Sequence, residues 1–345
     1  MDEKYIDFAV RKAEELINID SPTGYTDKAA EYVKKEFEKL GFSARYTTKG
    51  GVIVDLGGED EDDGIIIMTH IDTIGAMVSG VKGNGRLSMA PLGGLHAPGL
   101  EGENVKVYTR DGRVYSGTIQ LPNPSVHVAD EFDKAERSWK TLECVLDENV
   151  KTKQDVLDLG ICNGDIVALD PKFTVTGSGY IKSRFLDDKL SVAIALSMGK
   201  YIAENGITPK RKVWLHVTVY EEIGHGGSAS VPKGVTEGLS IDMGCVGDGI
   251  ECTEHQVSIC AKDAGGPYSY CVVSSLIEGA KKEGADYCVD VYPHYGSDVE
   301  TTLRSGHAIK HGLIGPGVYA SHCYERSHKD GVKNTLLVLK AYLGI

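Results

Sequence analysis

Residues 64–70 read Gly64-Ile65-Ile66-Ile67-Met68-Thr69-His70, a short apolar run that ends in polar residues. An uninterrupted apolar run of this length is typical of a strand buried on both faces, as the strands of parallel sheets are. The polar residues at its C-terminal end then lie at the edge of the sheet, where open α/β folds place their functional sites. The run therefore predicts an α/β fold with His70 at a candidate site.

Segments on both sides of this run alternate as an α/β fold requires. Apolar residues recur at helical spacing over 5–18, 26–40, 190–203, 269–284 and 335–343, and they alternate as in a strand over 212–220. The acidic run Glu59 to Asp63, which comes directly before the buried strand, is expected to be a solvated turn.

The middle of the chain has a different character. Short β-type runs at 105–108, 114–119 and 165–169 alternate with glycine and proline, and helical periodicity nearly disappears. Strands at this spacing predict a small barrel or sandwich. We therefore expect one α/β domain built from residues 1–71 and 179–345, interrupted by a β-barrel domain over residues 72–178.

Charge and cysteine content limit the classes of partner and compartment. The 345 residues contain 37 Lys and Arg against 50 Asp and Glu, and the net charge of −13 disfavours nucleic acid or an anionic membrane as a partner. The eight cysteines form no Cys-x-x-Cys pair, as is typical of reduced thiols in a cytosolic protein. No signal peptide and no apolar run of about 18 residues is recognisable, so we expect a soluble, cytoplasmic protein.

Five segments place His, Asp or Glu at predicted strand ends, where open α/β sheets have their sites. They are His70-Ile71-Asp72, Leu186-Asp187-Asp188-Lys189, Tyr220-Glu221-Glu222-Ile223-Gly224, Ile241-Asp242-Met243-Gly244 and Ser321-His322-Cys323. Each has an ordinary interpretation in isolation: Asp187 can be a helix N-cap, His70 a buried histidine and Asp242 a turn residue. Likewise, His322 can be a surface group. Their joint occurrence instead favours a site for divalent zinc, cobalt or manganese, which accept mixed histidine and carboxylate ligands.

Two of these segments have a spacing that suits such a site. Asp72 stands two residues after His70, from where it can reach the far ring nitrogen of that histidine and fix its tautomer. The adjacent acids Glu221 and Glu222 repel each other unless a cation or a shared proton relieves them. One of the two can then bind the ion while the other faces a bound water.

The order of these motifs resembles that of the M42 family of dinuclear metallo-aminopeptidases, the tetrahedral or deblocking aminopeptidase group. The likeness covers nearly the whole chain and includes Ser21-Pro22-Thr23-Gly24, Gly93-Gly94 and Tyr295-Gly296-Ser297-Asp298. It implies a mixed-sheet, phosphorylase/hydrolase-like catalytic domain with an inserted PDZ-like barrel for dimerisation. The implied activity is hydrolysis of the N-terminal peptide bond of short peptides by a metal-bridging hydroxide. The implied assembly is a dimer that builds a dodecamer.

The resemblance also implies a metal-binding role for five residues. His70, Asp187 and Asp242 would hold one divalent ion, and Asp187, Glu222 and His322 the other, with Asp187 rather than Asp188 as the bridge. Zinc is the expected metal, and cobalt or manganese are alternatives.

Further roles follow from the same resemblance. Glu221 would be the general base, and Asp72 would orient His70. Apart from the resemblance, the segment Tyr295-Gly296-Ser297-Asp298 has the composition of a loop that can line the pocket, so Ser297 and Asp298 are candidate substrate-binding residues; the alternative is a simple turn. The chain departs from the commoner family pattern at Lys189, at His225-Gly226-Gly227 and at Met243-Gly244-Cys245.

Other functions stay open at this point. A glycoside hydrolase uses two carboxylates without a metal, but it leaves His70 and His322 unexplained, and the chain has only two Trp residues. An amino-acid deacylase would use the same ligand set as an aminopeptidase. A non-catalytic, metal-dependent assembly protein would need no acid at Glu221.

Overall fold

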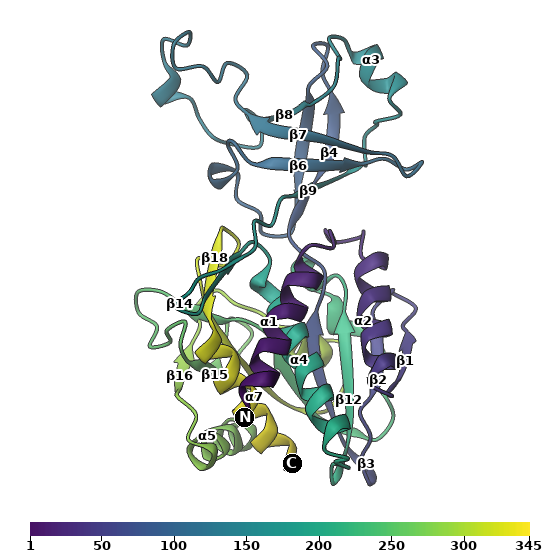
Figure 1. The fold of residues 1–345 in the computed structure, drawn as a ribbon, viewed down its shortest axis with the longest axis vertical. Helices are drawn as coiled ribbons and strands as arrows, with labels where there is room; N and C mark the ends of the chain where they lie inside the picture. The colour runs from purple at the N-terminus through teal and green to yellow at the C-terminus, as the bar shows by residue number, and fades with distance from the viewer. The chain divides into compact units, whose positions relative to one another are not determined.

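The computed structural model describes residues 1–345 and divides them into two compact units. The larger unit contains Met1–Asp72 and Lys172–Ile345, and the smaller unit is Thr73–Pro171. The predicted fold class is confirmed, because a mixed α/β sheet is interrupted by a six-stranded antiparallel barrel (Figure 1).

A 12-stranded sheet forms the larger unit. Its main path runs through β1 (Ser43–Tyr46), β2 (Val52–Asp55), β12 (Arg211–Thr218), β3 (Asp60–His70), β13 (Val235–Ile241), β17 (Lys310–Tyr319), β18 (Glu325–His328), β11 (Tyr180–Ser183) and β10 (Thr174–Val175). Three further strands pair beside this path: β14 (Gly244–Val246), β15 (Val257–Lys262) and β16 (Tyr287–Val291). The central strands β12, β3, β13 and β17 are parallel, so their carboxyl ends lie at one edge of the sheet.

Helices cover the sheet so that β3 is buried as its sequence predicts. The helices are α1 (Glu3–Ile17), α2 (Asp27–Lys39), α4 (Leu186–Glu204), α5 (Tyr270–Glu283), α6 (Asp298–Arg304) and α7 (Lys329–Leu343). Figure 1 shows α1 beside α4, and α4 packs against β3. The Thr302 hydroxyl of α6 contacts the Met68 sulfur of β3 at 3.4 Å. None of the helices is both long and apolar enough to cross a membrane.

The acidic run before β3 differs from the prediction of a turn. Asp60 to Asp63 are exposed, but they form the first residues of β3. Strand β12 begins opposite them, with Arg211 paired to Asp60, and the Arg211 guanidinium lies 3.0 Å from the Asp63 carboxylate. This neighbouring cation offsets the repulsion between the acids, so the strand extends through them.

The smaller unit is a closed barrel of antiparallel strands. The order is β4 (Gly75–Val81), β5 (Leu87–Leu92), β8 (Glu143–Leu146), β7 (Val114–Gln120), β6 (Asn104–Tyr108) and β9 (Ile166–Leu169), and β9 pairs with β4. Alternate side chains such as Leu87, Val107 and Ile119 are fully buried in it. The helix α3 (Lys153–Asp158) precedes β9. Residues 172–178, which we placed in the insertion, group with the larger unit, where β10 pairs with β11.

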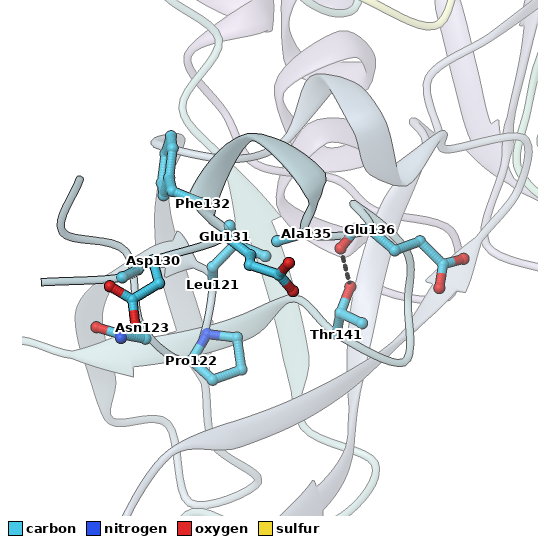
Figure 2. A pocket seen from close by; sticks show the side chains of 10 residues that line it. Leu121, Pro122, Asn123, Asp130, Glu131, Phe132, Ala135, Glu136 and Thr141 are labelled. Carbon is cyan, nitrogen blue, oxygen red and sulfur yellow. Dashed lines mark hydrogen bonds between the residues drawn. The ribbon is translucent and has the colours of Figure 1, made fainter.

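A pocket of about 420 Å³ lies in the smaller unit. Leu121, Pro122 and Phe132 give it a largely apolar wall, and Thr141 at its rim donates a hydrogen bond to the Glu136 carbonyl (Figure 2). None of the His, Asp and Glu residues that the sequence places at a metal site lines this pocket.

Candidate metal centre

The carboxyl ends of the parallel strands bring the five predicted segments together. His70 is the last residue of β3, and Asp242 directly follows β13. The 3₁₀ turn η3 (Glu221–Ile223) comes after β12, and His322 comes after β17. Asp187 lies in the first turn of α4, where its own backbone is not helical. The site is thus built from chain segments that only the sheet topology makes neighbours.

Asp187 occupies the middle of this cluster. Its Oδ1 lies 3.2 Å from His70 Nε2, and its Oδ2 lies 3.5 Å from His322 Nε2. His322 Nε2 is also 3.5 Å from the Glu222 carboxylate. One carboxylate therefore faces two histidines, each through a different oxygen.

Two overlapping groups of donor atoms share His70. His70, Asp187 and Glu222 form one group, and His70, Asp188 and Asp242 form the other. Within each group the ligand atoms all lie within 4.8 Å of one another. The Glu221 carboxylate lies 3.7 Å from His70 Nε2, beside both groups.

Buried negative charge dominates the cluster. Burial and the neighbouring Asp187 carboxylate raise the pKa of Asp242 to about 7. Burial likewise raises the pKa of Glu221 and that of Glu222 well above their usual range. Asp187 is the exception, because hydrogen bonds with His322 and His70 outweigh the effect of burial and lower its pKa.

The donor set fits divalent cations. Asp188 is fully buried, yet its Oδ1 has no hydrogen-bond partner. A buried carboxylate oxygen without a partner is costly unless a cation binds it. Five carboxyl groups surround only two imidazoles, at Asp187, Asp188, Glu221, Glu222 and Asp242. Histidine nitrogens and carboxylate oxygens are ligands that zinc, cobalt and manganese accept.

Asp72 is positioned differently from the sequence-based expectation. Its backbone carbonyl, and not its carboxylate, accepts the hydrogen bond from His70 Nδ1, at 2.9 Å. That contact directs Nε2 of His70 toward Asp187. The Asp72 carboxylate instead accepts the backbone N–H groups of Glu221 at 3.1 Å and Glu222 at 3.4 Å. Asp72 thus holds both the histidine and the pair of glutamates.

Ser297 and Asp298 are buried and bonded to protein groups. The Ser297 hydroxyl lies 2.9 Å from the Tyr268 hydroxyl. The Asp298 carboxylate accepts the Gly227 N–H at 2.5 Å and the Thr218 hydroxyl. These partners favour a role in holding the segment after Glu222 over direct contact with substrate.

Glu325 also belongs to the site, although no role for it was predicted from the sequence. Its carboxylate accepts the N–H of Asp187 at 3.1 Å and the N–H of His322 at 3.0 Å. Burial, with the nearby Asp187 charge, raises the pKa of Glu325 to about 8. The only sequence feature that links Glu325 to the site is its position three residues after His322. An acid at that spacing does not by itself predict a role in a site.

His225 and Cys245, two of the residues in the segments that depart from the commoner family pattern, take different positions. The His225 ring stacks on Tyr220, with 5.1 Å between ring centroids, and is exposed. Cys245 is half-buried, and its N–H donates to the Tyr292 hydroxyl at 3.2 Å.

Comparison with known proteins gives the family. The family model described as M42 glutamyl aminopeptidase matches residues 50–337. The chain belongs to this M42 family. The candidate aminopeptidase YhfE of Bacillus subtilis (strain 168) is 42% identical over 329 residues, which cover 95% of each chain. The protein is accordingly an M42 aminopeptidase, and its family implies dependence on metal.

Solved structures support the fold of this M42 chain. An aminopeptidase from the archaeon Desulfurococcus kamchatkensis aligns with a TM-score of 0.85 and 24% identity, covering 99% of this chain and 94% of the other. The TET1 peptidase of Pyrococcus horikoshii aligns with a TM-score of 0.85 and 23% identity, covering 96% and 98%.

Proposed function

We propose that this M42 aminopeptidase removes N-terminal residues from short peptides with two divalent ions bound at the cluster around Asp187. His70, Asp187 and Asp242 would hold one ion, with the Asp188 carboxylate beside it, and Asp187, Glu222 and His322 would hold the other. The proposal rests on the position of the Asp187 carboxylate. One of its oxygens faces His70 and the other faces His322. A carboxylate that bridges two cations needs this arrangement. Zinc is the proposed metal, with cobalt or manganese as alternatives.

The ions, when bound, supply Lewis-acid activation of the attacking water and of the scissile carbonyl. Glu221 is the proposed general base, which accepts the proton of the water and returns it to the departing amine. Its carboxylate lies at the cluster, and burial raises its pKa, as a group that both takes and releases a proton requires. Asp72 keeps Glu221 in place through its backbone N–H.

The proposed substrate end is the free α-amine of a peptide. Such an amine can coordinate one of the ions or meet a carboxylate at the cluster, such as Glu221 or Asp188, that the ions leave free. An amino-acid deacylase would instead have to accept an acylated nitrogen at the same place.

Self-association into dimers and a dodecamer is a further part of the proposal. One similar structure, PhTET1-12s, is a dodecamer, and the Pyrococcus horikoshii TET1 peptidase can assemble into a tetrahedron or a large octahedral shell. We assign the dimer contacts to the inserted barrel. Light scattering tests the assembly, and a monomeric mass would reject it.

We also place the protein in the cytoplasm. All eight cysteines are free, and four of them are buried. Unpaired cysteines in this number are typical of a reducing compartment.

One experiment tests the activity directly. Metal-stripped protein is assayed on aminoacyl-p-nitroanilides and on acylated amino acids, with zinc, cobalt and manganese added back separately. We expect hydrolysis of the anilides only, and only after a metal is restored. Full activity in EDTA would reject the metal-dependent mechanism, and a preference for acylated amino acids would identify a deacylase.

A further inference from the structure

Two thiols and a carboxylate form a second cluster in the larger unit, apart from the centre around Asp187. The donor atoms of Cys252, Cys288 and Asp290 all lie within 4.8 Å of one another. Their residues are 3%, 8% and 4% exposed. Cys288 and Asp290 belong to β16, whereas Cys252 lies in the irregular segment between β14 and β15. The proposed peptidase chemistry uses none of the three.

The Asp290 carboxylate is buried without a cation. Its Oδ1 accepts the Glu251 N–H at 2.9 Å, and its Oδ2 accepts the Ser258 hydroxyl at 3.3 Å and the Cys288 thiol at 3.0 Å. No lysine, arginine or histidine forms an ion pair with it. Buried charges in proteins are generally paired or coordinate a metal, so three neutral donors leave this charge uncompensated.

The two cysteine thiols indicate which kind of cation the cluster can bind. Neither is in a disulfide, and each is a hydrogen-bond donor: Cys288 to Asp290, and Cys252 to the Thr253 carbonyl at 3.4 Å. Paired cysteine sulfurs select zinc and other soft ions over magnesium or calcium. Two sulfurs and one carboxylate oxygen fill three positions of a tetrahedral site, and a backbone carbonyl can fill the fourth and close it.

We propose that Cys252, Cys288 and Asp290 form a structural zinc site. One divalent ion replaces the two thiol protons, which leave to solvent, so the cluster keeps its net charge of −1. The ion bonds to both sulfurs and to the Asp290 carboxylate, and no group is oxidised or reduced.

Such a site would stabilise an irregular segment of the chain. Residues 247–256 contain no helix or strand, and the site would tie them to β16 through Cys252. A path of hydrogen bonds leads from there to Cys245, close in sequence to the candidate metal centre. The Tyr292 hydroxyl bonds to Ser258, a partner of Asp290, and also accepts the N–H of Cys245, three residues after Asp242.

Cobalt(II) provides a specific test, because thiolate ligands give cobalt a charge-transfer absorption that histidine and carboxylate ligands do not. Protein stripped of metal is titrated with cobalt(II) while absorbance and bound metal are measured. We expect a third equivalent per chain, with the thiolate band. Cys252→Ser and Cys288→Ser should each lose that equivalent and the band.

Matched variants locate the signal. Cys162→Ser and Cys271→Ser, which change exposed thiols, should keep the band, and so should Cys245→Ser, which changes the half-buried thiol near Asp242. His70→Ala should lose metal from the peptidase centre and keep the band, so failure of the proposed peptidase chemistry is distinguishable from failure of this site.

Two outcomes overturn the proposal. One is a wild-type protein without the thiolate band at cobalt saturation, and the other is a band that survives both Cys252→Ser and Cys288→Ser. If the serine variants do not fold, X-ray absorption on zinc-loaded wild type decides, because the proposal requires sulfur in the zinc coordination shell. A spectrum with only nitrogen and oxygen neighbours rejects it.

Discussion

Asp187, Asp72 and Glu325 show how single residues build the site. Asp187 faces His70 and His322, Asp72 holds the N–H groups of Glu221 and Glu222, and Glu325 holds those of Asp187 and His322. Residue type and order were enough to predict that histidines and carboxylates converge. The partners of Asp72 and Glu325 were not predictable, because backbone N–H groups exist at every position and only the fold decides which ones face a carboxylate.

Replacement of Glu221 by Gln separates catalysis from metal binding. The amide keeps the shape of the side chain but cannot take a proton, so we expect turnover to fall by about 10²–10⁴-fold while bound metal is unchanged. Metal analysis and kcat on an aminoacyl-p-nitroanilide measure the two effects. Glu222→Gln should lose metal as well, and Glu59→Gln, an exposed change, should alter neither. Near-normal turnover in Glu221→Gln would remove Glu221 from its assigned role.

His216 of β12 makes stability depend on pH. It is buried, its Nδ1 has no hydrogen-bond partner, and burial, with Lys49 and Arg45 nearby, lowers its pKa from 6.5 to about 3. Between those values the unfolded chain binds a proton that the folded chain excludes, so the free energy of unfolding falls as the pH drops below 6.5. At pH 4.5 the loss is about 2–3 kcal/mol.

Urea unfolding of chelator-treated protein at pH 7 and pH 4.5 measures this loss. His216→Gln should show a correspondingly smaller decrease between the two pH values, whereas the exposed change His294→Gln should behave like wild type. An equal decrease in His216→Gln and wild type would mean that His216 does not titrate as described.

At the scale of elements, the apolar run before His70 is the most informative part of the sequence. Ile65, Ile66 and Ile67 are buried on both sides of β3, as a central parallel strand requires. The predicted helices are found to within a few residues, apart from the last, which begins at Lys329 rather than at 335. The acidic start of β3 was not predictable, because its pairing with Arg211 involves a strand about 150 residues later.

Gly226→Ala tests how the segment after the glutamate pair is held. A Cβ at Gly226 would lie 2.4 Å from Asp298 Oδ1 and 2.9 Å from Thr218 Oγ1, which are groups that bond to each other. We expect a loss of about 1–3 kcal/mol in stability and at least a tenfold loss in kcat/KM, because the segment must move and carries Glu221 and Glu222 with it. Thermal unfolding and peptidase assays check both.

Gly177→Ala is the matched control, since a Cβ there meets no atom within 4 Å. It should change neither quantity by a measurable amount. Unchanged activity in Gly226→Ala would show that Asp298 does not set the position of the glutamate pair.

At the scale of the whole molecule, all proposed ligands of the peptidase centre lie in the larger unit, and none lies in Thr73–Pro171. The ligands come from positions 70 to 322, so bound ions link segments from both ends of the chain. The order of motifs along the sequence was sufficient to expect one discontinuous domain. The pocket beside Phe132 and the cluster at Cys252 were not predictable, because no motif or periodicity accompanies them.

Metal removal should therefore destabilise the two units unequally. An ion that binds only the folded state adds about 4 kcal/mol when its free concentration is 1,000 times its Kd. In a unit of this size each ion corresponds to roughly 8–16 °C in melting temperature, so the three proposed ions together raise it by at least that much. Differential scanning calorimetry with zinc and with EDTA should show one transition whose melting temperature changes by at least this amount. A second transition, from the barrel, should keep its melting temperature.

Two variants assign the change to the two clusters. His70→Ala should reproduce most of the decrease in melting temperature that EDTA causes, and Cys288→Ser should give a separate and smaller decrease. A larger unit that melts at the same temperature in zinc and in EDTA would mean that neither cluster binds the ion.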